Sequence, residues 1–311
     1  MTNIVFMGTP QFAAPTLEAL VEAHRVVGVV TQPDRPAGRG RDLRQSPVKR
    51  TALEHDLPLF QPRSLRNAEA LDRLADWQPD VIVVAAFGQI LSQEVLDLPP
   101  YGCLNVHASL LPRWRGAAPV AAAILNGDEV TGVTVMKMDA GLDTGPILAQ
   151  REEPIRADDT RATLTKRLSY VGAELLAETL PAYVSGELEP RPQAGDEATF
   201  ADQLDKQDGR LDWSRTAVEL DRKIRAFTPW PGTFTFWEGK RLKVLEASPL
   251  PDWAGDVAPG VVVEVDEGAA VTTSKGALRL EEVQLAGKRA MAMGPFLRGR
   301  RDFVGSKLGR G

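Results

Sequence analysis

Hydrophobic and polar positions follow two different periods along the first half of the chain. Residues 4–7 and 26–31 are apolar, partly β-branched runs typical of strands, and residues 12–21 between them show helical spacing. Residues 81–86 form an uninterrupted apolar run, as expected of a parallel strand buried on both faces. Further helices are predicted at 65–77 and 163–180, and further strands at 104–106, 132–138 and 147–151. This order predicts an open, Rossmann-like α/β sheet with ligands at the carboxyl ends of its strands.

The pattern changes in the second half of the chain. Residues 187–206 are polar and rich in Pro and Gly, which predicts a linker. A helix is predicted at 216–224, followed by closely spaced strands at 233–237, 242–246, 260–265, 270–273 and 278–284. Short strands separated by turn residues favour a small, OB-like β-barrel. We therefore expect an α/β domain at 1–186, a linker at 187–206 and a barrel domain at 207–311.

Composition narrows the class of protein. Apolar residues make up 43% and charged residues 25%, which is ordinary for a globular protein. No apolar run is long enough to cross a bilayer, so we expect no membrane partner. The amino terminus leads directly into the first strand without a signal peptide, which predicts a cytoplasmic protein. Cys103 is the only cysteine, and its apolar flanks indicate a core residue rather than a nucleophile.

Charge is unevenly distributed, although the net charge is only −5. Residues 206–311 carry 18 Lys and Arg against 14 Asp and Glu, whereas residues 1–205 carry 19 against 28. A basic second part is typical of proteins with a polyanionic partner. Residues 34–50 also combine six basic side chains with Gly and Pro. This segment is either a solvated loop or one that becomes ordered on phosphates.

Candidate catalytic residues lie around the strand at 104–106. Asn105 and His107 are two residues apart, so on an extended segment they point to the same face. An amide donor beside an imidazole can stabilise charge on oxygen and move a proton. Asp143 lies in a Gly-flanked turn, from which a carboxylate could orient that imidazole. Each residue alone is also compatible with a structural role. His24 and His55 are expected at the surface, and no Cys or His cluster has metal-ligand spacing.

Taken together, these residues resemble the folate-dependent formyltransferases. Three blocks carry the resemblance: TQPDRPAGRG at 31–40, SLLPRWRGAAP at 109–119 and IRAFTPWPG at 224–232. The middle block is similar to the whole family, and the other two are similar to its tRNA-directed branch. The resemblance implies transfer of a formyl group from 10-formyltetrahydrofolate to the amino group of methionine on initiator tRNA. It implies no metal, and it suggests that the chain acts as a monomer.

The resemblance also implies roles for individual residues. Asn105 would bind the formyl oxygen, and His107 would support the same charge or pass a proton to the leaving nitrogen. Asp143 would orient His107 and could relay the proton of the amine, so the division of proton transfer stays open. The implied folate-binding residues are Ser109, Leu110, Leu111 and Pro112, with Phe87, Gly88 and Leu91 as a pocket wall. Core packing is an equally good interpretation of Phe87 and Leu91. The implied tRNA-binding residues are Arg35, Arg39, Arg41, Arg44, Lys206 and Arg298.

Two other functions remain open at this point. Formyl transfer to a small amine, such as a nucleotide sugar, would explain the catalytic residues but would leave the Arg-rich segment unused. A tRNA-binding module without activity would explain the basic surfaces, but the complete set of Asn105, His107 and Asp143 argues against it.

Overall fold

The computed structural model describes residues 2–37, 42–266 and 268–309. By contacts, the chain forms two compact units. Unit 1 contains Met1–Pro119, Val130–Pro154 and Leu164–Ala201, and unit 2 contains Val120–Glu129, Ile155–Thr163 and Asp202–Gly311. No helix in the described part of the chain is long and apolar enough to cross a membrane.

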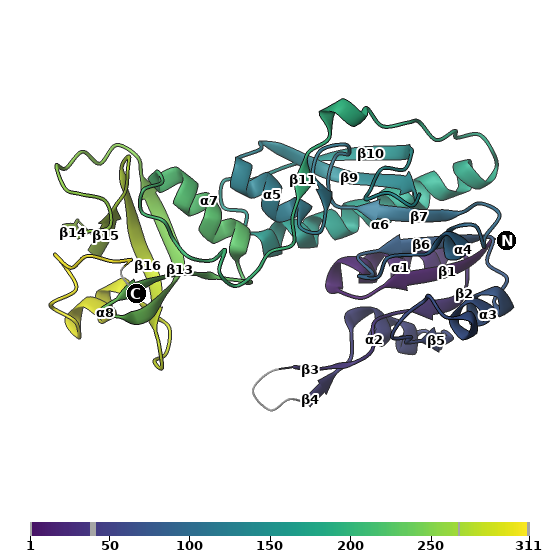
Figure 1. Ribbon diagram of the computed structural model, residues 1–311, viewed down its shortest axis with the longest axis horizontal. Helices are drawn as coiled ribbons and strands as arrows, with labels where there is room; N and C mark the ends of the chain where they lie inside the picture. Colours follow the sequence, from purple (N-terminus) through teal and green to yellow (C-terminus); the bar gives the residue numbers. More distant parts are fainter. Residues whose placement is uncertain (1, 38–41, 267, 310–311) are drawn as a thin grey trace. The chain divides into compact units, whose positions relative to one another are not determined.

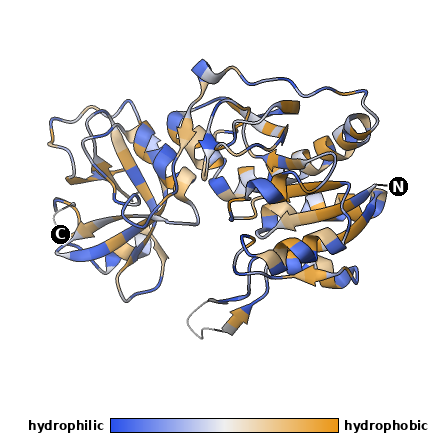
Figure 2. Cartoon of the chain, turned by 45° about the vertical axis from the view of Figure 1, so that its right-hand side comes forward, coloured by the Kyte–Doolittle hydropathy of each residue, from blue (hydrophilic) through white to orange (hydrophobic). Residues whose placement is uncertain are grey.

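Unit 1 is built on a seven-stranded sheet with the order β10-β9-β7-β6-β1-β2-β5 (Figure 1). Its strands are β1 (Asn3–Gly8), β2 (Arg25–Val30), β5 (Leu59–Phe60), β6 (Val81–Ala85), β7 (Cys103–His107), β9 (Val130–Lys137) and β10 (Ile147–Pro154). The first five are parallel, whereas β9 runs antiparallel to both β7 and β10. All five residues of β6 are buried, as predicted, and Figure 2 shows the hydrophobic colour of the central strands.

Helices cover both faces of this sheet. They are α1 (Ala14–Ala23) after the short turn η1 (Gln11–Ala13), α2 (Pro47–Glu54), α3 (Ala68–Asp76), α4 (Gln93–Leu96) and α6 (Arg161–Val184). The remaining helix of the first half, α5 (Pro119–Asn126), belongs to unit 2 from Val120 onward. Buried residues of α3 and α4 pack with Ile82 and Val84 of β6. On the opposite face, Gly172 of α6 leaves room for Val106, since a Cβ there would lie 2.8 Å from Val106 Cγ1. The sheet is thus the middle layer of an α/β sandwich, as the order of elements predicts.

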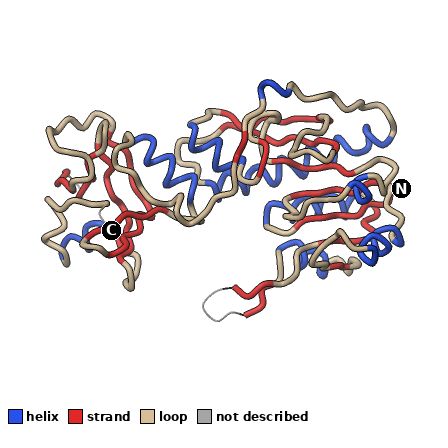
Figure 3. Tube along the Cα trace, viewed as in Figure 1, coloured by secondary structure: helices blue, strands red, loops and turns tan. Residues whose placement is uncertain are grey.

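Two segments of unit 1 contain more structure than expected. Two short strands, β3 (Arg35–Ala37) and β4 (Asp42–Arg44), pair as an antiparallel ribbon that projects from the edge of unit 1 (Figure 1). The expected linker after α6 is a long loop with one turn, η2 (Gly195–Glu197), as Figure 3 shows. It then forms β11 (Phe200–Ala201), which pairs with β8 (Arg115–Gly116). Part of the expected linker is therefore packed on unit 1.

Unit 2 contains an antiparallel sheet with the order β12-β13-β16-β15-β14, and β17 pairs with β16. The strands are β12 (Thr233–Trp237), β13 (Lys240–Leu250), β14 (Val262–Val265), β15 (Gly268–Thr272), β16 (Ala277–Leu285) and β17 (Met291–Ala292), with helices α7 (Ala217–Phe227) and α8 (Met293–Arg298). Residues 305–309 run between the edge strands, because Leu308 N–H donates to Gly260 O and Gly309 N–H donates to Phe236 O. Irregular chain thus joins the two edges of the predicted barrel.

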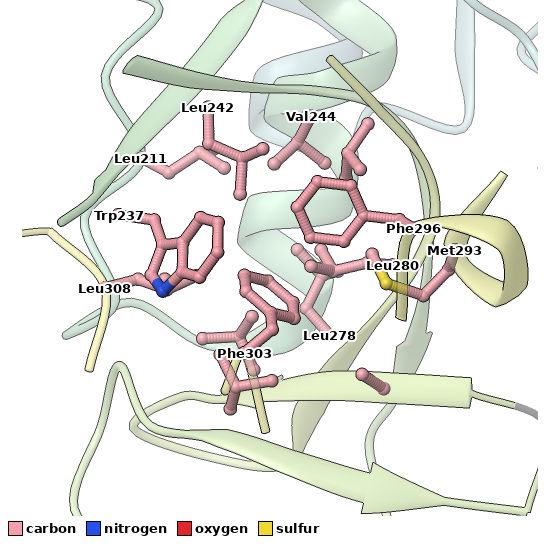
Figure 4. Packing of buried hydrophobic residues seen from close by; sticks show 14 of the residues in the cluster. Leu211, Trp237, Leu242, Val244, Leu278, Leu280, Met293, Phe296, Phe303 and Leu308 are labelled. Atoms are coloured by element: carbon pink, nitrogen blue, oxygen red, sulfur yellow. The ribbon is translucent and has the colours of Figure 1, made fainter. Parts of the chain in front are cut away.

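The core of unit 2 is centred on three aromatic rings. Trp237 of β12, Phe296 of α8 and Phe303 contact one another edge to face, with centroids 5.0–5.9 Å apart (Figure 4). Phe303 is completely buried although it lies in a turn after α8. Aromatic contacts of this kind add to the free energy of burial, so the last part of the chain is needed to complete the core.

We predict that Phe303→Ala lowers the free energy of unfolding of unit 2 by about 3–5 kcal/mol, because it leaves a cavity between two rings. Denaturant unfolding followed by tryptophan fluorescence would measure this effect. Val304→Ala is the matched control, since Val304 is 37% exposed. A loss no larger than that of the control would show that Phe303 does not support this core.

Candidate active site

Strand β7 places both predicted catalytic side chains on one face of the sheet. Cys103, Asn105 and His107 alternate with Leu104 and Val106, and Val106 faces α6. The Cys103 thiol donates to Val95 O of α4, and burial raises its pKa to about 12. Cys103 is therefore a core residue, as predicted. Asn105 and His107 point to its side of the sheet, beyond the end of the apolar core.

Asp143 approaches this pair from the loop between β9 and β10. Its Oδ2 lies 3.7 Å from His107 Nδ1, and its Oδ1 lies 3.5 Å from Asn105 Nδ2. The loop is tight at Gly145, where a Cβ would lie 1.8 Å from Lys137 O. Asp143 itself has a left-handed backbone with φ of 52°, which Asp tolerates better than most residues. The structure thus brings the three predicted catalytic residues together.

The second contact of each side chain defines the geometry. Gly116 N–H of β8 donates to Asp143 Oδ2 at 2.8 Å. His107 Nε2 lies 3.0 Å from Trp114 O, which can only accept a hydrogen bond. Both nitrogens of the imidazole therefore face oxygen atoms, Nε2 at hydrogen-bond distance and Nδ1 at ion-pair distance, so this setting favours a positive charge on the ring. Sequence reasoning missed Trp114 and Gly116, because backbone groups leave no signal in residue type.

This arrangement suits acyl transfer to an external amine. Asn105 supplies an amide N–H whose contact with Asp143 is long, so it can turn toward an oxygen that gains negative charge. His107 can carry a positive charge next to it, and Asp143 can balance that charge. Of the residues that the structure describes, no group of His, Cys, Asp and Glu could hold a metal ion.

Residues 109–112, which the resemblance implies in folate binding, are hydrogen-bonded by two side chains that the sequence analysis missed. Thr134 of β9 accepts from Leu111 N–H at 3.0 Å and donates to Ser109 O at 2.7 Å. Gln150 of β10 donates to Leu111 O at 2.8 Å. The Ser109 hydroxyl is completely buried and donates to Arg113 O, so it shapes the loop from inside. Leu111 is buried, whereas Leu110 and Pro112 are half-buried. The backbone and the side chains of Leu110 and Pro112 are the parts that could contact a ligand.

The implied pocket wall lies where β6 ends. Phe87 and Leu91 are buried in the core cluster of α3 and α4, which agrees with the packing alternative. Their role toward folate stays a prediction. Gly88 is exposed and has φ of 82°, so the chain turns sharply there. Thr9 Oγ1 and Gln32 Nε2 both donate to Phe87 O, which ties this turn to the ends of β1 and β2.

The β3–β4 ribbon carries the first set of basic candidates. Arg35 and Arg44 are exposed and lie directly opposite each other across the ribbon. Like charges in this position repel each other, which a bound polyanion would relieve. Arg39 and Arg41 lie outside the described residues. At the base of the ribbon, Lys49 and Gln61 donate hydrogen bonds to Asp34 at 2.6 and 3.0 Å, and these bonds lower the pKa of that carboxyl.

The second set of basic residues implied in tRNA binding lies on unit 2. Lys206 and Arg298 are both exposed, so a partner could reach them. Two aromatic side chains of β12 also make cation–π contacts, with the half-buried Arg241 of β13 and with the exposed Arg210, which precedes these strands. The guanidinium of Arg241 lies 3.4 Å from the centroid of Phe234, and that of Arg210 lies 5.6 Å from the centroid of Phe236. Stacking on aromatic rings holds these cations in place.

The two other histidines differ. His55 is exposed, as predicted. The surface position predicted for His24 is wrong, because the residue ends α1 against the beginning of β2 and is half-buried. Its Nε2 is buried and has no hydrogen-bond partner in the described structure, and burial lowers its pKa.

Comparison with known proteins is consistent with this geometry. Residues 2–180 match the family described as "Formyl transferase", and residues 203–301 match "Formyl transferase, C-terminal domain". The chain belongs to the formyl transferase family. It is 49% identical over 309 residues to the methionyl-tRNA formyltransferase of Roseiflexus sp. (strain RS-1), covering 99% of this chain and 95% of that one. It is 51% identical over 309 residues to that of Thiobacillus denitrificans, covering 99% of each.

Solved structures show the same fold at lower identity. The N-formyltransferase of Helicobacter canadensis in complex with folinic acid and dTDP-3-aminofucose has a TM-score of 0.66 at 18% identity, with 93% of this chain and 100% of that chain covered. HypX of Aquifex aeolicus in complex with tetrahydrofolic acid has a TM-score of 0.63 at 19% identity, with 97% of this chain and 48% of that chain covered. An α/β formyl transferase domain followed by a small β domain is therefore the architecture of this chain.

We predict that Asp143→Asn lowers the formyl-transfer rate about 10²- to 10³-fold and changes folate affinity little, because it removes the charge that balances an imidazolium. Single-turnover kinetics and direct folate binding would separate the two effects. Asp139→Asn is the control, since it makes the same change in the same loop and keeps the oxygen that accepts from Gly141 N–H. Loss of folate binding with normal single-turnover chemistry would make Asp143 a binding residue instead.

Proposed function

We propose that this formyl transferase transfers the formyl group of 10-formyltetrahydrofolate to the amino group of methionine on initiator tRNA. The observation that carries the proposal is the pair of opposed arginines, Arg35 and Arg44, on a ribbon of the unit that also holds the catalytic residues. A small neutral acceptor would leave the repulsion between the two arginines in place, whereas the phosphates of a nucleic-acid backbone would relieve it. Relatives named methionyl-tRNA formyltransferase, which match 99% of the chain, support the same substrate.

The reaction needs no nucleophile from the protein, because the amine of methionine attacks the formyl carbon. The C–O double bond becomes an oxyanion, and Asn105 Nδ2 donates to it. The oxyanion then re-forms the carbonyl as the C–N bond to the folate breaks, and the leaving nitrogen takes a proton, either from a His107 imidazolium or from the attacking amine by way of Asp143 and water. His107 supports the oxyanion as a cation held between Trp114 O and Asp143. The attacking amine loses a proton, which the Asp143 carboxylate beside His107 can accept through water.

Two regions would share the tRNA. The β3–β4 ribbon would contact the acceptor end, and its base is fixed by the ion pair between Asp34 and Lys49, 2.6 Å apart. Residues 207–311 would hold the body of the tRNA through the stacked Arg210 and Arg241 and through Arg298. Lys206 precedes this region. We propose that the chain acts as a monomer in the cytoplasm, where initiator tRNA is charged.

The direct test compares acceptors. The protein is incubated with labelled 10-formyltetrahydrofolate and with either methionyl initiator tRNA or a nucleotide-linked amino sugar. We expect labelled formyl on the methionine of the tRNA and none on the amino sugar, because the sugar does not bind the basic ribbon. Formylation of the sugar but not of the tRNA would establish the small-amine function. Binding of tRNA without transfer to either acceptor would indicate a binding module.

The basic ribbon gives a second prediction. The affinity for tRNA should fall steeply with salt, with a log–log slope of several units, because several phosphates release counterions. Arg44→Ala should weaken tRNA binding and reduce this slope by about one unit, while hydrolysis of the folate donor in the absence of tRNA stays unchanged. Arg66→Ala is the control, since Arg66 is exposed and lies in the loop that precedes α3 in the sequence rather than on the ribbon. An affinity independent of salt would contradict the assignment of the ribbon.

A further inference from the structure

The segment expected to be a linker is attached to the catalytic loops at several points. Arg191 exchanges two backbone hydrogen bonds with Ile147, the first residue of β10. Ten residues later, β11 pairs with β8, and Thr199 O accepts from Arg115 N–H at 2.9 Å. Gln193 lies between these attachments, in the long loop seen after α6 in Figure 3. Its side chain is half-buried, whereas the adjacent Pro192 and Ala194 are exposed.

The side-chain amide of Gln193 makes four hydrogen bonds. Its Nε2 donates to Asp143 O at 2.8 Å and to Gly145 O at 2.7 Å. Its Oε1 accepts from Arg115 Nε at 3.1 Å and from Arg115 Nη2 at 2.7 Å. An amide has two N–H donors and two lone pairs, so every hydrogen-bonding position is used. The orientation is unambiguous, because the reverse one would place oxygen against two carbonyls.

Arg115 and Gly116 connect this amide to the reacting groups. The Arg115 side chain is only 6% exposed, and the next residue, Gly116, donates its N–H to Asp143 Oδ2. Gly116 must be glycine, because its φ is 114° and a Cβ would lie 2.7 Å from Ala201 O. Asp143 is thus held at its carboxylate by β8 and at its carbonyl by Gln193. A left-handed residue needs such contacts to persist.

We infer that Gln193 is a positioning residue for formyl transfer, acting through the loop that carries Asp143. It ties Asp143 and Gly145 to the buried guanidinium of Arg115, and the four hydrogen bonds of its amide go to these residues rather than to Asn105 or His107. Its effect therefore passes through the placement of the Asp143 carboxylate, for which a shift of about 1 Å can cost up to about 100-fold in rate. The inference rests on the proposed function, since it assigns a role within that reaction.

The main variant is Gln193→Leu, which keeps the bulk and removes all four hydrogen bonds. We expect kcat for methionyl-tRNA to fall at least about tenfold, while KM for tRNA and for the folate donor changes less than about threefold. Gln193→Glu keeps the contact with Arg115 but places a carboxylate oxygen against the carbonyls of Asp143 and Gly145, so a loss at least as large as that of Gln193→Leu is expected. Gln203→Leu is the matched control, since Gln203 is an exposed glutamine ten residues further on.

A double variant separates positioning from a general loss of structure. If Gln193 acts through the Asp143 carboxylate, Gln193→Leu should cost less than about threefold in the Asp143→Asn background, because the group that it positions is already inactive. Hydrogen exchange measured by mass spectrometry should show faster exchange at 139–146 in Gln193→Leu and unchanged exchange in unit 2. Losses that multiply in the double variant, an effect confined to KM, or unchanged exchange at 139–146 would each overturn the inference.

The proposed function is judged separately, on the unsubstituted protein. If that protein does not formylate methionyl-tRNA, the acceptor assignment fails. The same variants are then compared by hydrolysis of 10-formyltetrahydrofolate, in which water replaces the amine and Asp143 keeps its place. A normal hydrolysis rate in Gln193→Leu, with a reduced rate in Asp143→Asn, would overturn the positioning role alone.

Discussion

The hydrogen bond from Gly116 N–H to Asp143 Oδ2 is the interaction on which the arrangement of the site depends. It holds a carboxylate within 3.7 Å of His107 Nδ1, and it exists only because β8 has a glycine where β11 passes closely. The loop of Asp143 in turn needs Gly145 to pass the end of β9. The contact between Asp143 and His107 thus depends on close backbone approaches at Gly116 and Gly145, which a residue with a Cβ could not make.

The described residues place arginines in two different settings, across a narrow ribbon of unit 1 and against an aromatic ring of unit 2. Arg35 and Arg44 repel each other across a narrow ribbon, whose base is held by Asp34 and Lys49. On unit 2, the guanidinium carbon of Arg241 lies over the ring of Phe234, 3.4 Å from its centroid. The first arrangement favours a partner that changes the local electrostatics on arrival, and the second presents a cation already in position. An acceptor that is large and anionic can use both.

The parts of the fold that depend on local pattern could be predicted from the sequence. The apolar run of β6 and the period of two that joins Asn105 to His107 were sufficient to place those residues. Contacts between distant residues were not predictable in this way. The composition of the expected linker did not predict the hydrogen bond between Gln193 and Asp143, because the local content of Pro and Gly carries no information on contacts with residues 50 positions away. Trp114 O was missed for the same reason, since a carbonyl is present at every residue.

The thiol of Cys103 can report when strand β7 separates from α4. The thiol is shielded by α4, and its pKa of about 12 keeps it protonated and therefore unreactive at neutral pH. A thiol reagent can label it only after α4 and β7 separate. Because Asn105 and His107 lie on the same strand, the labelling rate in the native protein would measure how often the catalytic strand loses its packing. The single cysteine makes this measurement possible without any substitution.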